Sequence, residues 1–196
     1  MEPLPLFAIA LTLAWLSGLR VYLTVLAVGV AGVAGWVELP PALALCESPW
    51  ILGLAGLLTA VEFSADKIPG VDSVWDLLNT LARVPVGALL AGATLGGPED
   101  ALSSFGLLAG GSAALLSHGL KSGARALINT SPEPLSNGLA SLGEDSLAVS
   151  ALLLVLHAPW LALALLVGVS LGGFVLLFWL LRVLGRRLRG RSTEPA

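Results

Sequence analysis

The sequence predicts an all-α integral membrane protein, a bundle of about six membrane segments. Of its 196 residues, 56% are hydrophobic and only 12% are charged, whereas a soluble domain is about 45–50% apolar and about 25% charged. The mean hydropathy is +0.91. The apolar residues also form runs close to the roughly 20 residues that cross a bilayer. These runs leave no length for a separate soluble domain.

The first half of the chain holds three apolar segments. Residues 4–34 form the first, which at about 1.5 Å per residue is too long for one straight crossing. A Ser-Gly pair and Arg20 interrupt it, so we expect a strongly tilted or broken helix. Residues 49–65 form the second segment, and Pro49 suits its first turn because the missing N–H is not needed there. Residues 74–95 form the third.

The second half begins with an apolar segment at residues 102–127. The region 129–145 follows, and two closely spaced prolines near its start predict a break in regular helix. If this region re-enters the membrane, its backbone groups could bind an ion, because irregular backbone at that depth lines a cavity or is buried in protein. If it lies in the cytoplasm, it is only a loop. Residues 146–157 form a short fifth segment, and residues 159–184 form the sixth.

We therefore expect two membrane halves, residues 1–97 and 98–186, followed by a basic tail at 187–196. Short landmarks recur between the halves: Gly18-Leu19-Arg20 with Gly119-Leu120-Lys121, and Pro49-Trp50 with Pro159-Trp160. With three segments in each half, the second half would enter the membrane upside down. This pattern predicts a 3+3 inverted repeat of the kind found in many transporters.

The placement of Lys and Arg predicts the orientation. Arginines at 182, 186, 187, 189 and 191 favour a cytoplasmic C-terminus, and six crossings then put the N-terminus in the cytoplasm too. Residues 38–47 and 99–100 carry acids but no Lys or Arg, so we expect them outside. The expected location is a bacterial inner membrane.

Four acids make up the strongest candidate site. Glu62 and Asp66 are four residues apart and share one helix face, and Asp72 and Asp76 repeat this spacing at the start of the next segment. Ionisable groups inside membrane segments are costly and mark functional sites by default. The four carboxylates could hold a cation through oxygen ligands or relay protons. The alternative is a cytoplasmic turn held by Lys67 and capped by Asp72.

Five basic residues are candidate counter-charges to these acids: Arg20, Lys67, Arg83, Lys121 and Arg125. Arg83 lies inside a segment, and we expect it to pair with Glu62 or Asp66, in a site or as a structural ion pair. Lys121 and Arg125 form a cationic stripe on one helix face. They could face the acids or an anionic group, or extend to the membrane surface.

Other chemistry has little support in the sequence. Asn129 and Glu133 join the candidate ion-binding residues through the region of the break. Cys46 is the single cysteine, so an intramolecular disulfide framework is excluded. No phosphate loop, nucleophile motif or metal-ligand spacing is present, so no cofactor is implied, an enzyme is not favoured and the identity of any metal stays open.

Several stretches resemble the bacterial membrane proteins of domain-of-unknown-function family 4126. They are Gly18 to Leu23, Glu62 to Asp72, Ser117 to Arg125 and Asn129 to Pro134. The resemblance covers about residues 6 to 185. It implies a membrane protein and brings no established activity with it.

The sequence therefore favours a transporter or channel for a small ion or polar solute, with a cation or proton first. The alternative is a membrane scaffold or accessory subunit whose intramembrane charges are structural. The expected partners are the lipid bilayer, a small ion or solute, and a second copy of the chain in a homo-oligomer. A net charge of −3 points to no nucleic-acid partner.

Overall fold

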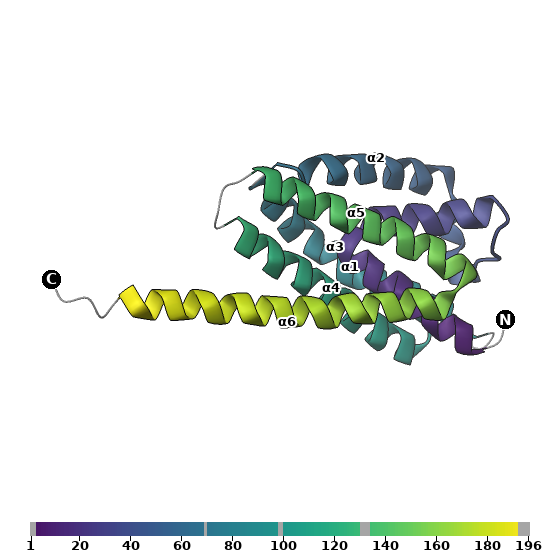
Figure 1. Ribbon diagram of the computed structural model, residues 1–196. Coiled ribbons are helices and arrows are strands. Elements are labelled where there is room, and N and C mark those ends of the chain that lie inside the picture. The colour runs from purple at the N-terminus through teal and green to yellow at the C-terminus, as the bar shows by residue number, and fades with distance from the viewer. Residues whose placement is uncertain (1–2, 69, 98–99, 130–133, 192–196) are drawn as a thin grey trace.

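The computed structural model describes residues 3–68, 70–97, 100–129 and 134–191. Within these residues the chain forms six α-helices, one 3-10 helix and no strand, so the all-α fold class is confirmed (Figure 1). The elements are α1 (Pro3–Val33), η1 (Pro41–Glu47), α2 (Pro49–Ala65), α3 (Val71–Thr94), α4 (Ser104–Ile128), α5 (Pro134–His157) and α6 (Pro159–Arg191).

Four helices in the described part of the chain are long and apolar enough to cross a membrane: α1, α3, α5 and α6. The pair η1 and α2, bent by 67°, would make a fifth span. The expected number of about six spans is not confirmed by this count. The central helix α4 is not among the candidates. Its inner face carries His118, Lys121 and Arg125, which are buried within the bundle.

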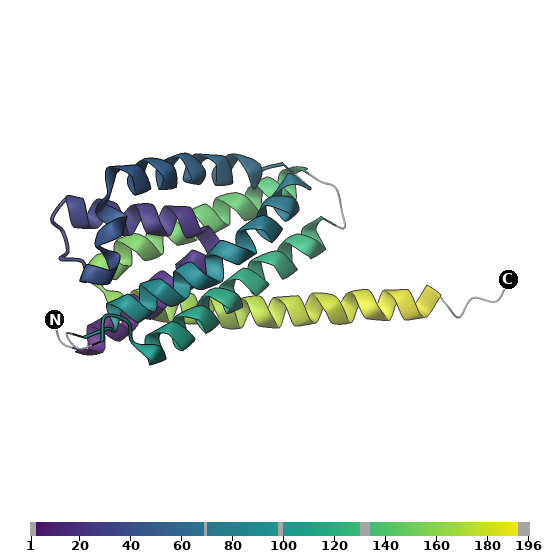
Figure 2. The same cartoon turned by 180° about the vertical axis from the view of Figure 1, so that it is seen from behind.

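The first helix doubles back on itself. Arg20 has non-helical backbone angles, φ −143° and ψ 76°, and α1 bends there so that its two arms run toward the same end of the bundle (Figures 1 and 2). Leu13 and Val28, one from each arm, pack in one hydrophobic cluster. The expectation of a tilted or broken helix is resolved as a break, with Arg20 at the tip of a helical hairpin.

This hairpin changes the expected topology. Both ends of α1 lie at the same end of the bundle, so only α2 to α6 run its length, and the described chain begins and ends at opposite ends (Figures 1 and 2). This arrangement does not confirm the expected cytoplasmic location of both termini. The inverted repeat is not confirmed either, since α4, the expected counterpart of α1, is a helix of 25 residues with no such break.

Small residues let the three central helices approach closely. A side chain at Gly18 would collide with Ala114 and Ser117 of α4, and one at Gly87 of α3 would collide with Ala114. Glycine and alanine at such crossings are typical of packed membrane helices, where van der Waals contact replaces the hydrophobic effect as the driving force. The core of the bundle is therefore α1, α3 and α4.

The fifth helix begins earlier than expected. We predicted broken or re-entrant backbone over 129–145, but α5 is continuous from Pro134 to His157. The prolines misled the prediction because proline at the first helical position disturbs no hydrogen bond. Residues 130–133 lie outside the described residues. This longer α5 carries Glu144 and Asp145 alongside α1.

Candidate functional site

The break in α1 places the guanidinium of Arg20 in the interior. The residue is fully buried, and its Nη1 pairs with Asp66 at the C-terminal end of α2. Its Nη2 lies 2.5 Å from Asp145 Oδ1 and 3.5 Å from Glu144 Oε2 of α5. The guanidinium also lies over the ring of Phe63, 5.2 Å from its centroid. The tip of the hairpin is thus held between α2 and α5.

Lys121 joins three helices from its position on α4. Its Nζ donates a hydrogen bond of 2.9 Å to Asp66 Oδ2. It also lies 3.2 Å from Asp76 Oδ1 and 3.5 Å from Glu144 Oε2. Lys121 has a fully buried side chain, so it does not extend to the membrane surface. It links the acids of α2, α3 and α5.

Arg83, on α3, is a further cation with several partners. Its Nη2 donates to Glu62 Oε1 at 2.7 Å, and its Nη1 lies 2.8 Å from Asp76 Oδ1. The same Nη1 lies 3.0 Å from His118 Nδ1. The expected pairing of Arg83 with Glu62 is confirmed, and both side chains are fully buried.

Arg125 lies nearer the ends of α2, α4 and α5. It makes two hydrogen bonds to Glu144, of 3.1 and 3.0 Å, and also donates to the side chain of Asn137. Asp72 lies 3.9 Å from it. The amide of Asn129 donates to both oxygens of Asp72, at 3.3 and 3.1 Å, which ties the end of α4 to the start of α3.

These contacts form one connected set, which we call the charge network. Its members are Arg20, Glu62, Asp66, Asp72, Asp76, Arg83, Lys121, Arg125, Glu144 and Asp145. Six carboxylates meet four cations, an excess of two negative charges. Lys67, whose side chain is 45% exposed, lies 3.8 Å from Asp145 at the edge of the charge network. Its positive charge offsets part of that excess.

Burial is uneven across the charge network. Glu62 and Asp66 have fully buried side chains, whereas Glu144 and Asp145 keep 16% and 17% of theirs exposed. Among the described residues, Glu62 Oε2, Asp66 Oδ1 and Asp76 Oδ2 are buried without a hydrogen-bond partner. A buried carboxylate oxygen left unsatisfied is costly. The buried part of the charge network therefore has carboxylate oxygens that could accept further hydrogen bonds. The part of the network on α5 is more exposed to solvent.

The model of the family described as a domain of unknown function, DUF4126, matches residues 7–182. The chain belongs to this family. The match covers every member of the charge network, from Arg20 to Asp145, and agrees with the resemblance seen in the sequence. No curated protein and no solved structure matches the chain at a significant level. The fold and composition make this DUF4126 chain a membrane protein.

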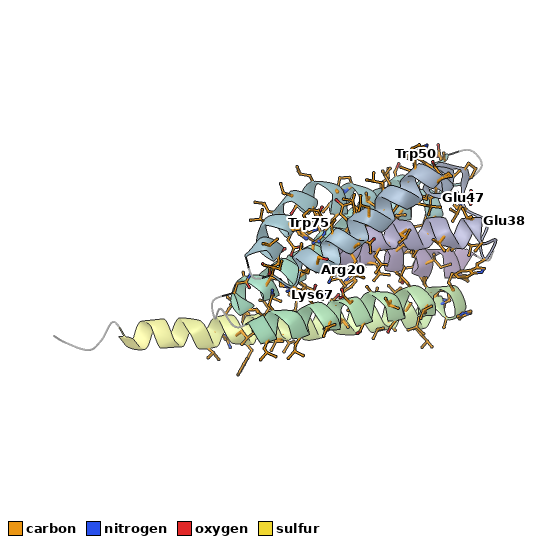
Figure 3. The ribbon with its side chains drawn as sticks, turned by 90° about the horizontal axis from the view of Figure 1, so that it is seen from above. Arg20, Glu38, Glu47, Trp50, Lys67 and Trp75 are labelled. Atoms are coloured by element: carbon orange, nitrogen blue, oxygen red, sulfur yellow. The ribbon has the colours of Figure 1, made fainter. Side chains whose placement is uncertain are left out.

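The structure brings most of the predicted site residues of this DUF4126 protein together. All four predicted acids, Asn129 and four of the predicted counter-charges belong to the charge network or contact it directly, while Lys67 lies at its exposed edge. Glu133 lies outside the described residues. In Figure 3, Arg20 and Lys67 lie nearer the C-terminal end of α6, and Glu38 and Glu47 lie at the far end.

The sequence reasoning missed the contribution of α5 and of one histidine. Glu144 and Asp145 contact Arg20, and Asn137 contacts Arg125. Two adjacent acids within an apolar run were the available signal, but the misplaced start of α5 hid it. His118 was visible only as a polar residue beside Lys121. Among the described residues of the DUF4126 chain, no group of three or more His, Cys, Asp and Glu side chains is arranged to hold a metal ion.

Proposed function

We propose that this membrane protein transports or conducts a small cation, with the proton as the preferred species, through the charge network. The observation that carries the proposal is the excess of two carboxylates over cations in the charge network, together with three buried carboxylate oxygens that have no hydrogen-bond partner among the described residues. Like charges repel strongly where the dielectric constant is low. A bound proton or small cation would relieve that repulsion.

The proton fits this arrangement better than a divalent metal. The carboxylates are spread between cations, and none of the described clusters has the ligands that would hold a metal ion. Asp66 and Asp76 lie 2.9 and 3.2 Å from the amino group of Lys121, distances that suit direct proton transfer between neighbouring groups. Acids in such chains are typical of proton paths through membranes.

The proposal includes an orientation. Lys67 lies nearer the end from which α6 projects, and Arg182 lies in the C-terminal part of α6, whereas Glu38 and Glu47 lie at the other end (Figure 3). The segment between α3 and α4, which contains Asp100, also lies at that other end (Figures 1 and 2). By the positive-inside rule the α6 end is cytoplasmic. The N-terminus is then outside, the hairpin of α1 enters from outside, and the charge network lies below its tip in the inner half of an inner membrane.

Flux through purified protein tests the proposed function. Proteoliposomes with an internal pH dye would be given a pH step, and separate preparations a gradient of Na⁺, K⁺, Ca²⁺ or Mn²⁺. We expect protein-dependent proton flux, with or without coupling to a second ion. Absence of flux for every ion in correctly folded protein would overturn the proposal.

The second candidate function is a membrane scaffold with structural charges. It is favoured by one observation: each of the four buried cations in the charge network contacts at least one carboxylate. Buried cations that all have acidic partners can fix helix register without any transport. Folded protein with no flux, together with a stable homo-oligomer or a co-purifying membrane protein, would support this reading.

A further inference from the structure

His118 joins the charge network through hydrogen bonds on both ring nitrogens. Its Nδ1 lies 3.0 Å from Arg83 Nη1, and its Nε2 lies 2.8 Å from Thr80 Oγ1. Thr80 in turn donates its hydroxyl proton to the carbonyl oxygen of Asp76, at 3.0 Å. His118 is 7% exposed. The imidazole is thus buried between the guanidinium of Arg83 and the hydroxyl of Thr80, which already donates its proton to Asp76.

These partners determine the form of the imidazole. Arginine only donates hydrogen bonds, so Nδ1 must accept and carries no proton. Thr80 gives its one proton to the carbonyl of Asp76, so its oxygen accepts from Nε2–H. His118 is therefore neutral, with its proton on Nε2. Its one free site for a proton, Nδ1, is the atom that holds Arg83.

We propose that His118 is a proton-binding residue that controls the position of Arg83. Protonation of Nδ1 would place an imidazole N–H donor opposite a guanidinium N–H donor of Arg83. Two positive charges would then face each other across the present 3.0 Å contact. Arg83 would have to leave His118, and its contacts with Glu62 and Asp76 would change. The inference rests on the proposed function, because it names one residue that would bind the transported proton.

The surroundings of His118 contain both signs of charge. Arg83 and Asp76 face it from α3, and Lys121 lies one turn further along its own helix. Glu62 from α2 is connected to the imidazole through its contact with Arg83. Arg20 from α1 and Glu144 from α5 are connected to the imidazole's helix through the contacts of Lys121. Asp76, which pairs with Arg83, is thus a carboxylate available to stabilise the imidazolium once Arg83 has moved.

The chemical step is a simple proton transfer. An O–H bond of a hydronium ion breaks, an N–H bond forms at Nδ1, and a water molecule is left. The guanidinium of Arg83 keeps all its protons, and no electrons are transferred. Release toward the other side reverses the step, and Arg83 then returns to Nδ1.

Nitrogen NMR on the imidazole tests the inference without any transport assay. The chain has two histidines, so the His157→Gln variant leaves His118 as the sole signal in protein labelled at histidine. At pH 8 we expect the neutral ring with its proton on Nε2. On acidification we expect Nδ1 to become protonated and the arginine signals to shift at the same pH. A ring protonated on Nδ1 at pH 8, or one that never titrates between pH 8 and 4, would overturn the inference.

Two substitutions separate the proton-binding role from a structural one. His118→Asn retains an oxygen that can accept from Arg83 but does not titrate, whereas His118→Leu removes the acceptor. We expect His118→Asn to fold like the wild type and to lose at least tenfold in proton flux. Wild-type flux and pH profile in His118→Asn would show that His118 only positions Arg83. No flux in the wild type, with the expected titration of His118, would overturn the proposed function and leave proton binding at His118 standing.

Discussion

Arg20 and Asp66, 46 residues apart in the chain, form an ion pair in which both side chains are fully buried. The pair joins the tip of the α1 hairpin to the end of α2. Removing one partner of such a pair costs far more than removing both, because the remaining charge is left in a medium of low dielectric constant. This ion pair therefore holds the hairpin tip against α2.

Replacement of Arg20 by glutamine should destabilise the protein strongly. The change leaves Asp66 and Asp145 without their contacts to the guanidinium, and loss of one buried partner typically costs about 3–5 kcal/mol. The measurement is the free energy of unfolding by SDS in mixed micelles. The double variant Arg20→Gln/Asp66→Asn should lose less than the sum of the single variants.

Lys67→Gln is the matched control for that prediction. Its side chain is 45% exposed and its acidic partner is 3.8 Å away, so its removal should cost well under about 1 kcal/mol. Equal losses in Arg20→Gln and Lys67→Gln would show that the hairpin tip is not held by its ion pairs.

Labelling of introduced cysteines should place the two ends of α1 on the same side. In a Cys46→Ser background, an impermeant maleimide applied to intact cells should label cysteines at Glu38 and at Asp100 but not at Lys67. A tag fused before residue 1 should be accessible from outside, because both arms of α1 run toward the end that carries Glu38.

The decisive comparison in that experiment is the N-terminal tag against a C-terminal tag. We expect only the N-terminal tag to be reached in intact cells, and both after permeabilisation. Protection of both tags in intact cells would restore the six-crossing topology and contradict the hairpin.

Gly18→Ala should destabilise the bundle. A methyl group at Gly18 would collide with the backbone of Ala114 and the hydroxyl of Ser117, and overpacking of this kind costs about 1–3 kcal/mol. The same change at Gly168 of α6, which has no neighbour within 4 Å, should be neutral or stabilise by up to about 1 kcal/mol. Thermal unfolding of the two variants in one detergent compares them, and a tolerated Gly18→Ala would refute the close crossing of α1 and α4.

Local signals in the sequence predicted much of the fold. The bounds of α2 were predicted as residues 49–65, as observed, because proline at a helix start and a following polar turn are properties of a few adjacent residues. The shared face of Glu62 and Asp66 followed from helix periodicity. The prediction that Arg83 pairs with Glu62 or Asp66 followed from the cost of a lone charge within an apolar segment, and the partner is Glu62.

The missed features depend on contacts between distant residues. The reversal of α1 at Arg20 is stabilised by Asp66 and Asp145, and nothing near Arg20 in the sequence distinguishes a reversal from a kink. The cytoplasmic N-terminus stays a prediction: it was counted from a single crossing by residues 4–34, whereas α1 reverses at Arg20. His118 entered the site through Thr80 and Arg83 on another helix, a relationship that periodicity within one helix does not contain.

Proton flux in proteoliposomes containing Glu62→Gln, compared with the wild type and Glu38→Gln, shows whether a buried carboxylate of the charge network is needed for transport. Glu62 is buried at the centre of the charge network, whereas Glu38 is exposed at the far end of the bundle, and both changes remove one carboxylate. We expect proton flux in the wild type and Glu38→Gln, and loss of flux by at least tenfold in folded Glu62→Gln. Flux at the wild-type rate in Glu62→Gln would contradict transport through the charge network.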